Sequence, residues 1–549
     1  MFKNKILSPY FILILIFTVA LFLRLYKLSE FPVGFHIDEA SLGYNGYSLL
    51  LTGKDENNHP NPLYIDTFGD NRPSGYHYLT VLPIKLLGLS EFATRLPAAL
   101  FGSITIFAIY FLVHVIFGNK KIALLSSFFV AIAPWHIVLS RASGEAVVAL
   151  FFILSGFSLI VYSIQNQKLS FLFFGTLLVS YSFFFYHTPR IFVPLFFLSL
   201  ILFLFPMLKR FKNRNYKIAI GSSWLFLIIV VFLLVFAVSG GTGRYTQVNI
   251  FSFPETRLIM EEQIREDGIL GTNVFTTRFF HNKVIDYSLT FISNYFEYFS
   301  GSFLFIKGGL PIWYNVHGMG LIYLVGFPFL VLGIILLTTH KKTEYKIPLI
   351  WLLVSPITAA ITVDDIPNIN RAIVMFPMIE LIVAYGALLF IDKIKSKAKI
   401  PVVILISIFV LFNFLYFLHQ YFVHAPIHRN WYRNEGFAEM IYTIKDSYNS
   451  VDKIVATKDA GGIYPLILFY MKYDPRVYQF EGSPKDRAYF GFGKFFFVPQ
   501  ACPSIDKDSR FPNAKKIIYV DKGECNDNGK NVKTIYRKDG TKVFNVVYE

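Results

Sequence analysis

Long apolar segments recur along the first 418 residues of the chain, separated by short polar connections. A helix needs about 17 to 25 apolar residues to cross the hydrocarbon core of a bilayer. About eleven segments reach that length, so the pattern predicts a polytopic α-helical membrane protein. The expected spans are residues 9–28, 95–118, 122–139, 145–164, 169–186, 191–208, 218–239, 319–339, 347–363, 374–391 and 400–418.

Basic residues mark every second connection between these spans, and by the positive-inside rule that side is cytoplasmic. The first connection on the opposite side, residues 29–80, is rich in Asp and Glu and has only two basic residues, Lys54 and Arg72. An odd number of spans then places the N-terminus in the cytoplasm and the end of the chain outside. The basic positions are Lys3, Lys5, Lys120, Lys121, Lys168, Lys209, Arg210, Lys212, Arg214, Lys217, Lys341, Lys342, Lys346, Lys393, Lys395, Lys397 and Lys399.

After residue 418 the composition becomes mixed, and short β-type runs appear at 453–457, 516–520 and 542–547. With an amphipathic stretch at 462–471, they predict a small extracytoplasmic α/β domain over residues 419–549. The two cysteines, Cys502 and Cys525, both lie in it. A disulfide is chemically allowed outside the cytoplasm, and two free thiols are the alternative.

Residues 1–418 form the predicted transmembrane domain, with long outer loops at 29–80 and 240–318. The second loop includes amphipathic stretches, such as residues 287–305, that fit the membrane surface. The net charge of +16 needs no nucleic acid, because much of it lies in cytoplasmic turns that face anionic lipid. The first span lacks a cleavage site and is expected to be retained.

An acidic pair, Asp38 and Glu39, follows the first span directly. Ionisable groups beside a bilayer are costly unless they have a function. A carboxylate here can accept the proton of a hydroxyl or amine nucleophile. Capping of the next helix by Asp38 is the alternative role.

Arginines occur at most short outer connections, against the positive-inside trend. Arg72, Arg95, Arg141 and Arg190 are the examples, and binding the phosphate of a lipid-linked donor would explain them. Snorkelling towards the interface is the alternative for Arg95 and Arg141. His187 fits a hydrogen bond within its turn.

The order of these motifs resembles the integral-membrane glycosyltransferases of the GT-C fold. The relevant segments are Asp38-Glu39, the Arg72-Pro73 region, the stretch from Arg95 to Gly102, and Ser140-Arg141 followed by Glu145. The chain is similar to the protein O-mannosyltransferases and lipid A aminoarabinose transferases of glycosyltransferase family 39 over about residues 1–391. The resemblance implies a GT-C-like catalytic domain.

The resemblance also implies chemistry, which is sugar transfer from a polyprenyl-phosphate donor to a lipid, glycan or protein acceptor. Asp38 matches the catalytic acid of the first outer loop, with Glu39 beside it, and Glu145 stands where the family usually has Asp. Inversion by single displacement is expected, with one carboxylate activating the acceptor, and no general acid is needed because the phosphate leaves already ionised. Candidates for the donor phosphate are Arg72, Arg95, Arg141, Arg190, Arg244 and Arg371, and His36 and His187 are further outer-face candidates.

The sequence identifies no cofactor, and a divalent metal ion is a candidate because Asp364-Asp365 offers oxygen ligands. A solvated loop is the alternative for that pair. A polytopic transporter or flippase remains the main alternative function. It predicts ionisable residues within the spans, which are nearly free of them.

Overall fold

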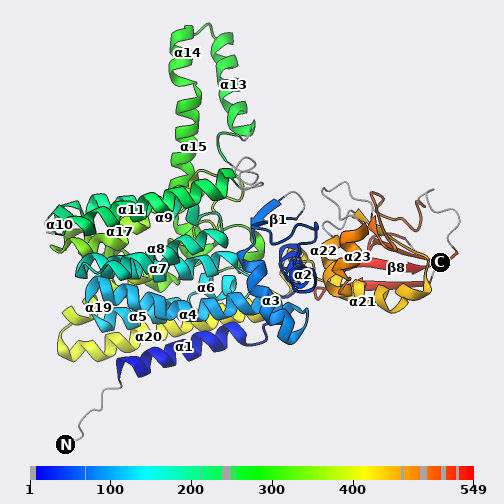
Figure 1. Cartoon of the computed structure of the whole chain (residues 1–549), viewed down its shortest axis with the longest axis horizontal. Helices are drawn as coiled ribbons and strands as arrows, with labels where there is room; N and C mark the ends of the chain where they lie inside the picture. Colours follow the sequence, from blue (N-terminus) through cyan, green and yellow to red (C-terminus); the bar gives the residue numbers. More distant parts are fainter. Residues whose placement is uncertain are drawn as a thin grey trace, which may run out of the picture. The chain divides into compact units, whose positions relative to one another are not determined.

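The computed structural model describes residues 8–67, 70–209, 211, 213–237, 249–252, 254–428, 430–458, 463–481, 491–507, 515–526 and 531–549. The chain forms two compact units (Figure 1). The helical unit comprises Met1–Arg24, Leu100–Ser140 and Glu145–Phe417, and the mixed unit comprises Leu25–Ala99, Arg141–Gly144 and Leu418–Glu549. The first outer loop thus groups with the C-terminal region, although the sequence pattern placed it with the spans.

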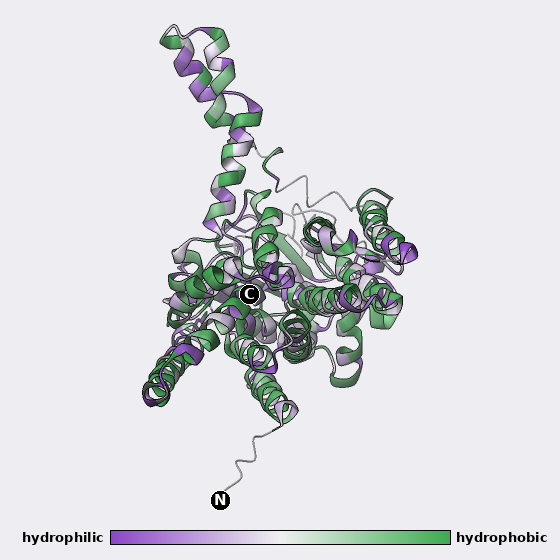
Figure 2. Cartoon of the chain, turned by 90° about the vertical axis from the view of Figure 1, so that its left-hand side faces the viewer, coloured by the Kyte–Doolittle hydropathy of each residue, from purple (hydrophilic) through white to green (hydrophobic). Residues whose placement is uncertain are grey.

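Apolar helices make up most of the helical unit; α5 and α19 pack against each other, and α11 and α20 run in roughly the same direction as this pair (Figure 1). Apolar residues predominate along most of these helices (Figure 2), as expected for helices in contact with lipid. The helices are α1 (Pro9–Leu25), α4 (Glu91–Phe117), α5 (Lys120–Ile132), α6 (Pro134–Ser140), α7 (Glu145–Asn166), α8 (Leu169–Tyr181), α9 (Pro189–Phe203), α10 (Phe205–Lys209), α11 (Arg214–Phe232), α16 (Phe327–Thr339), α17 (Ile347–Val354), α18 (Ile357–Ala360), α19 (Phe376–Lys393) and α20 (Ser396–His419).

The predicted number of spans is not confirmed. Among the described residues, four helical segments are long and apolar enough to cross a membrane: Glu91–Phe117, Glu145–Asn166, Arg214–Phe236 and Ser396–His424. A fifth would be the bent pair α5 and α6, which the sequence pattern merged into one span at 122–139. The two helices meet at 57° at Pro134, which lacks the amide N–H that a continuous helix needs.

Glycines allow α16 and α19 to approach closely. A Cβ at Gly386 would lie 2.1 Å from the Phe329 carbonyl oxygen, and one at Gly333 would lie 2.3 Å from that of Ile382. Close packing through small residues is the usual basis of helix association in lipid, where no hydrophobic driving force joins helices.

Part of the predicted loop 240–318 forms a helical hairpin that projects from the helical unit (Figure 1). It comprises α13 (Pro254–Ile269), α14 (Val274–Phe280) and α15 (Lys283–Glu297), and residues 254–297 are called the arm below.

The mixed unit has a six-stranded sheet in the order β4-β5-β3-β6-β8-β7. Strand β3 (Lys453–Thr457) is parallel to β5 (Phe495–Val498) and β6 (Ile517–Lys522). Antiparallel strands complete the sheet, namely β4 (Gly491–Phe492), β7 (Asn531–Tyr536) and β8 (Lys542–Tyr548). With α21 (Phe437–Ser447), α22 (Ile463–Met471) and α23 (Pro475–Glu481), this is the α/β arrangement that the sequence predicts.

The first outer segment completes the mixed unit. It forms α2 (Ile37–Thr52), the antiparallel hairpin of β1 (Tyr64–Thr67) and β2 (Asp70–Pro73), and α3 (Gly75–Leu87). Phe35 and Tyr44 are buried in one hydrophobic cluster with Phe469 and Tyr470 of α22. Burial of these rings fastens the first outer segment to the C-terminal region, because each contributes roughly 2 kcal/mol when removed from water.

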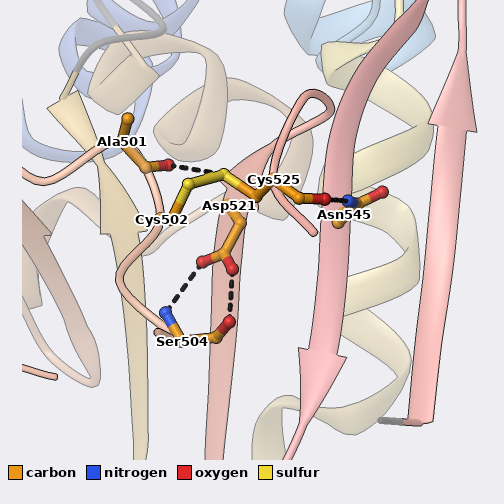
Figure 3. The surroundings of a disulfide bond; sticks show 6 residues. All are labelled: Ala501, Cys502, Ser504, Asp521, Cys525 and Asn545. Carbon is orange, nitrogen blue, oxygen red and sulfur yellow. Dashed lines mark hydrogen bonds between the residues drawn. A yellow bond between two sulfur atoms is a disulfide. The ribbon is translucent and has the colours of Figure 1, made fainter. Parts of the chain in front are cut away.

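Cys502 and Cys525 form a disulfide, with their Cα atoms 5.8 Å apart (Figure 3). The structure therefore favours the bonded alternative for these cysteines. The buried carboxylate of Asp521 accepts hydrogen bonds from the backbone N–H (3.0 Å) and hydroxyl of Ser504 (Figure 3). Asn545 Nδ2 donates to the Cys525 carbonyl at 3.1 Å, so both ends of the disulfide are held against the sheet.

Candidate active site

The acidic pair lies in the first turn of α2, and His36 is the N-cap residue. The His36 ring accepts a hydrogen bond from the Asp38 N–H at 3.2 Å, and the Glu39 carboxylate accepts one from the His36 N–H at 3.3 Å. His36 therefore has the capping role that the sequence offered as an alternative for Asp38. The Asp38 carboxylate stays available near a helix N-terminus, where a negative charge is stabilised.

Asp38 is partly exposed and paired with Arg72 of β2. Arg72 Nη2 lies 2.9 Å from Asp38 Oδ1, and their side chains are 23% and 27% exposed. Burial on its own would raise the pKa of Asp38, but the positive charge of Arg72 outweighs it and holds the pKa well below its usual range. Asp38 is consequently a solvent-accessible carboxylate that stays ionised at neutral pH.

Glu39 is buried, with only 3% of its side chain exposed. Arg95 Nε donates to its Oε1 at 2.9 Å, and Ser143 Oγ donates to the same oxygen at 3.1 Å. Arg433 donates to Oε2 from the C-terminal region. Burial alone would raise the pKa of Glu39, but the attraction of Arg95 and Arg433 lowers it.

The Glu39 carboxylate thus joins α2 to three segments that are distant in the sequence. These are the start of α4 through Arg95, the turn 141–144 through Ser143, and the segment before α21 through Arg433. A buried carboxylate with several charged and polar donors is stabilised mainly by these partners, and losing one of them is costly. We call Glu39, Arg95, Ser143 and Arg433 the buried ion cluster.

Two arginines that the sequence suggested for the donor phosphate have protein partners in this structure. Arg95 also donates to the carbonyls of Leu28 (3.1 Å) and Gly34 (2.8 Å). Arg141 donates to the Tyr26 carbonyl at 2.7 Å and lies over the Tyr421 ring. Both arginines are 0% exposed. Their burial against protein partners speaks against donor binding and also against snorkelling towards the membrane interface.

The remaining candidates described by the structure belong to the helical unit. Glu145 is the first residue of α7. Arg190 donates to the Phe183 carbonyl at 2.8 Å and lies 3.1 Å from His187 Nδ1, consistent with a hydrogen bond of His187 within its turn. Arg371 is paired with the Asp364 carboxylate at 2.7 Å, and Arg244 lies outside the described residues.

The Asp364 carboxylate is held by an arginine in this structure. Within the part of the chain that the structure describes, no group of three or more His, Cys, Asp or Glu side chains is placed to hold a metal ion.

Some buried polar residues were not identified from the sequence. Arg433 had no local signal, because its partner Glu39 is 394 positions away. Glu56 is fully buried, its Oε1 accepts from Thr67 Oγ1 at 3.2 Å, and burial raises its pKa to about 8. In the helical unit, Arg24 Nη1 donates to the Ala131 carbonyl at 3.1 Å. Its position inside an apolar run was a signal that the sequence analysis did not use.

Comparisons with known proteins identify the fold. The profile of the family described as dolichyl-phosphate-mannose-protein mannosyltransferase matches residues 71–239. The structure is similar to ArnT from Cupriavidus metallidurans bound to undecaprenyl phosphate, with a TM-score of 0.53, 10% identity and 97% of each chain covered. No curated protein matches the sequence.

The structure is also similar to the oligosaccharyltransferase of Archaeoglobus fulgidus in the apo form, with a TM-score of 0.52 and 12% identity. That match covers 85% of this chain but only 64% of the archaeal chain. The same archaeal enzyme, AglB, in complex with an inhibitory peptide and a dolichol-phosphate has a TM-score of 0.53 and 12% identity, with 86% and 64% covered. These matches confirm the predicted resemblance to the GT-C membrane glycosyltransferases.

Proposed function

We propose that this protein is a membrane glycosyltransferase that moves a sugar from a polyprenyl-phosphate donor to a lipid, glycan or protein acceptor on the outer face of the membrane. One observation carries the assignment of the base. Of two adjacent carboxylates, Asp38 is partly exposed and paired with the partly exposed Arg72. Glu39, in contrast, is buried among the donors Arg95 and Arg433. Similar folds bind undecaprenyl phosphate in ArnT and dolichol-phosphate in AglB.

In the proposed reaction, the acceptor hydroxyl or amine attacks the anomeric carbon of the donor sugar. The bond from that carbon to the phosphate oxygen breaks, and its electron pair leaves with polyprenyl phosphate. Asp38 takes the acceptor proton, so charge and protons balance without a general acid. Attack opposite to the leaving phosphate inverts the configuration of the anomeric carbon.

Arg72 has two roles in this proposal. Its guanidinium can bind the donor phosphate and stabilise the charge that develops as the phosphate leaves. When it turns to the phosphate, Asp38 loses part of the interaction that holds its pKa low. Donor binding would then make Asp38 a stronger base at the moment when the acceptor arrives.

Extraction of lipid-linked sugars from cells with and without the gene names the donor, because the unused donor accumulates when the enzyme is missing. Purified full-length protein is then assayed with that donor for release of free polyprenyl phosphate and for sugar on the acceptor. We expect Asp38→Asn to lower turnover by a factor on the order of 10² to 10⁴. Wild-type turnover in Asp38→Asn would refute the assignment of the base, and movement of intact donor across vesicles without release would favour a flippase.

A further inference from the structure

Among the residues that the structure describes, the arm is bound to the rest of the helical unit near its base. Near the end of α15, Asn294 Nδ2 donates to the Thr362 carbonyl at 3.0 Å, and the Tyr295 hydroxyl donates to the Leu353 carbonyl at 2.8 Å. No residue of α15 itself is buried. The rest of the arm extends from the bundle crosswise to α5, α11 and α20 (Figure 1).

Helix α15 turns its apolar side chains outward. Val284 is 74% exposed, Leu289 62% and Phe296 64%. At 100° per residue Leu289 and Phe296, together with Ile292 (48% exposed), fall within about 60° of one another on one side of the helix. Val284 lies on another side, and Asp286 is less exposed than any of them. A soluble hairpin would bury such a face against its partner helix, so something other than water covers it.

The tip of the arm extends this apolar surface. Six large apolar residues there are more than half exposed: Ile269, Leu270, Val274, Phe275, Phe279 and Phe280. With the face of α15, they amount to an apolar area on the order of 1,000 Å², larger than the patch of a few hundred Å² that a soluble monomer typically carries.

The two sides of the helical hairpin differ in the sign of their charge. From α14 to the start of α15 the chain carries Arg278 and Lys283 among aromatic residues, and no acidic residue lies between 268 and 285. Helix α13 carries the acidic residues Glu261, Glu262, Glu266 and Asp267 together with Arg257 and Arg265, so its net charge is negative. Basic and aromatic residues together fit the surface of an anionic bilayer, and acidic residues fit its aqueous side.

The direction of the arm agrees with this charge distribution. The long helices of the helical unit are long and apolar enough to cross a membrane, and an element that runs crosswise to such spans would lie along the membrane plane (Figures 1 and 2). We infer that the arm is an interfacial element, with the apolar face of α14 and α15 in the boundary between headgroups and acyl chains of an anionic bilayer and α13 towards water.

The test places single cysteines on the full-length protein, because the native Cys502 and Cys525 are bonded to each other. Phe275→Cys and Leu289→Cys report on the apolar face, and Glu262→Cys is the matched control on α13. Each protein carries an environment-sensitive fluorophore in vesicles of phosphatidylcholine with and without phosphatidylglycerol. All three positions are exposed, so the substitutions remove no core contact.

We expect lipids with a nitroxide near the headgroup to quench the labels at positions 275 and 289 at least about twofold more than the label at 262. A nitroxide at the end of the acyl chain should quench less, and Arg278→Gln with Lys283→Gln should remove the preference for phosphatidylglycerol. Equal quenching of all labels by aqueous iodide would overturn the inference. Cross-links between copies at Phe275→Cys without lipid quenching would overturn it too, since a second copy would then cover the face.

Discussion

Glu39→Gln and Asp38→Asn provide the sharpest test of the site, because adjacent carboxylates should give opposite phenotypes. Glu39→Gln leaves the charges of Arg95 and Arg433 in a site where Arg95 is 0% and Arg433 7% exposed. Removing one partner of a buried ion pair typically costs about 3 to 5 kcal/mol. For a unit of this size that corresponds to a fall in the unfolding midpoint of roughly 6 to 20 °C.

Asp38→Asn should leave that midpoint nearly unchanged. The pair of Asp38 with Arg72 is about one quarter exposed on each side, and pairs that reach solvent contribute no more than about 1 kcal/mol. The effects on turnover should be in the reverse order, because Asp38→Asn should lose far more turnover than Glu39→Gln. The assay measures thermal unfolding of the full-length protein in detergent, and turnover is normalised to the folded fraction.

A double-mutant cycle adds the control. If Arg433 is stabilised by Glu39, Arg433→Met should cost little in the Glu39→Gln background and much more in the wild-type chain. The reasoning is refuted if Glu39→Gln keeps the wild-type midpoint but loses turnover, since Glu39 would then serve the chemistry. It is equally refuted if Asp38→Asn lowers the midpoint as far as Glu39→Gln does.

Three further outcomes follow from the structure. Arg72→Gln should raise the donor KM and move the acid limb of the kcat/KM profile to higher pH, because the pKa of Asp38 rises without the arginine; an unshifted limb would separate Arg72 from the base. Glu56, whose folded pKa of about 8 exceeds its ordinary value, binds a proton in the folded state that the unfolded chain releases, so stability falls as pH rises from about 4.5 to 8. Unfolding midpoints at pH 5 and pH 8 should differ less in Glu56→Gln than in the wild type. A cysteine at the exposed Ser450 should react with a membrane-impermeant thiol reagent on intact cells, and labelling only after lysis would place the C-terminal region in the cytoplasm.

The elements that the sequence predicted well depend on local patterns. Strand β3 covers the predicted residues 453–457, and β6 and β8 differ from the predicted runs by one or two residues at their ends. The long apolar runs also located most of the apolar helices of the helical unit. It could not count spans, because a run of apolar residues continues through a bend such as the one at Pro134, and a helix of 13 residues such as α8 reads as a span when apolar residues flank it.

Of the candidate site, the sequence could predict only features that are visible within one segment of the chain. The acidic pair Asp38 and Glu39 could be singled out beside the first span, but the different environments of the two carboxylates could not, since the partners of Glu39 come from residues 95, 143 and 433. Likewise, an arginine at an outer turn looks the same in sequence whether it is partly exposed and paired with a carboxylate, like Arg72, or buried against backbone carbonyls, like Arg141. Tertiary contacts decide between these cases.

The geometry of α2 explains how one helical turn can place Glu39 in the buried ion cluster and leave Asp38 partly exposed. Successive residues of a helix differ in direction by 100°, so fixing the Glu39 side chain in the buried ion cluster turns Asp38 to a different side, towards Arg72 and solvent. Arg433 is a positioning residue in this arrangement, because it acts on the rotation of α2 through Glu39. The C-terminal region thereby contributes to the orientation of the proposed base, and it belongs to the same compact unit as the first outer loop.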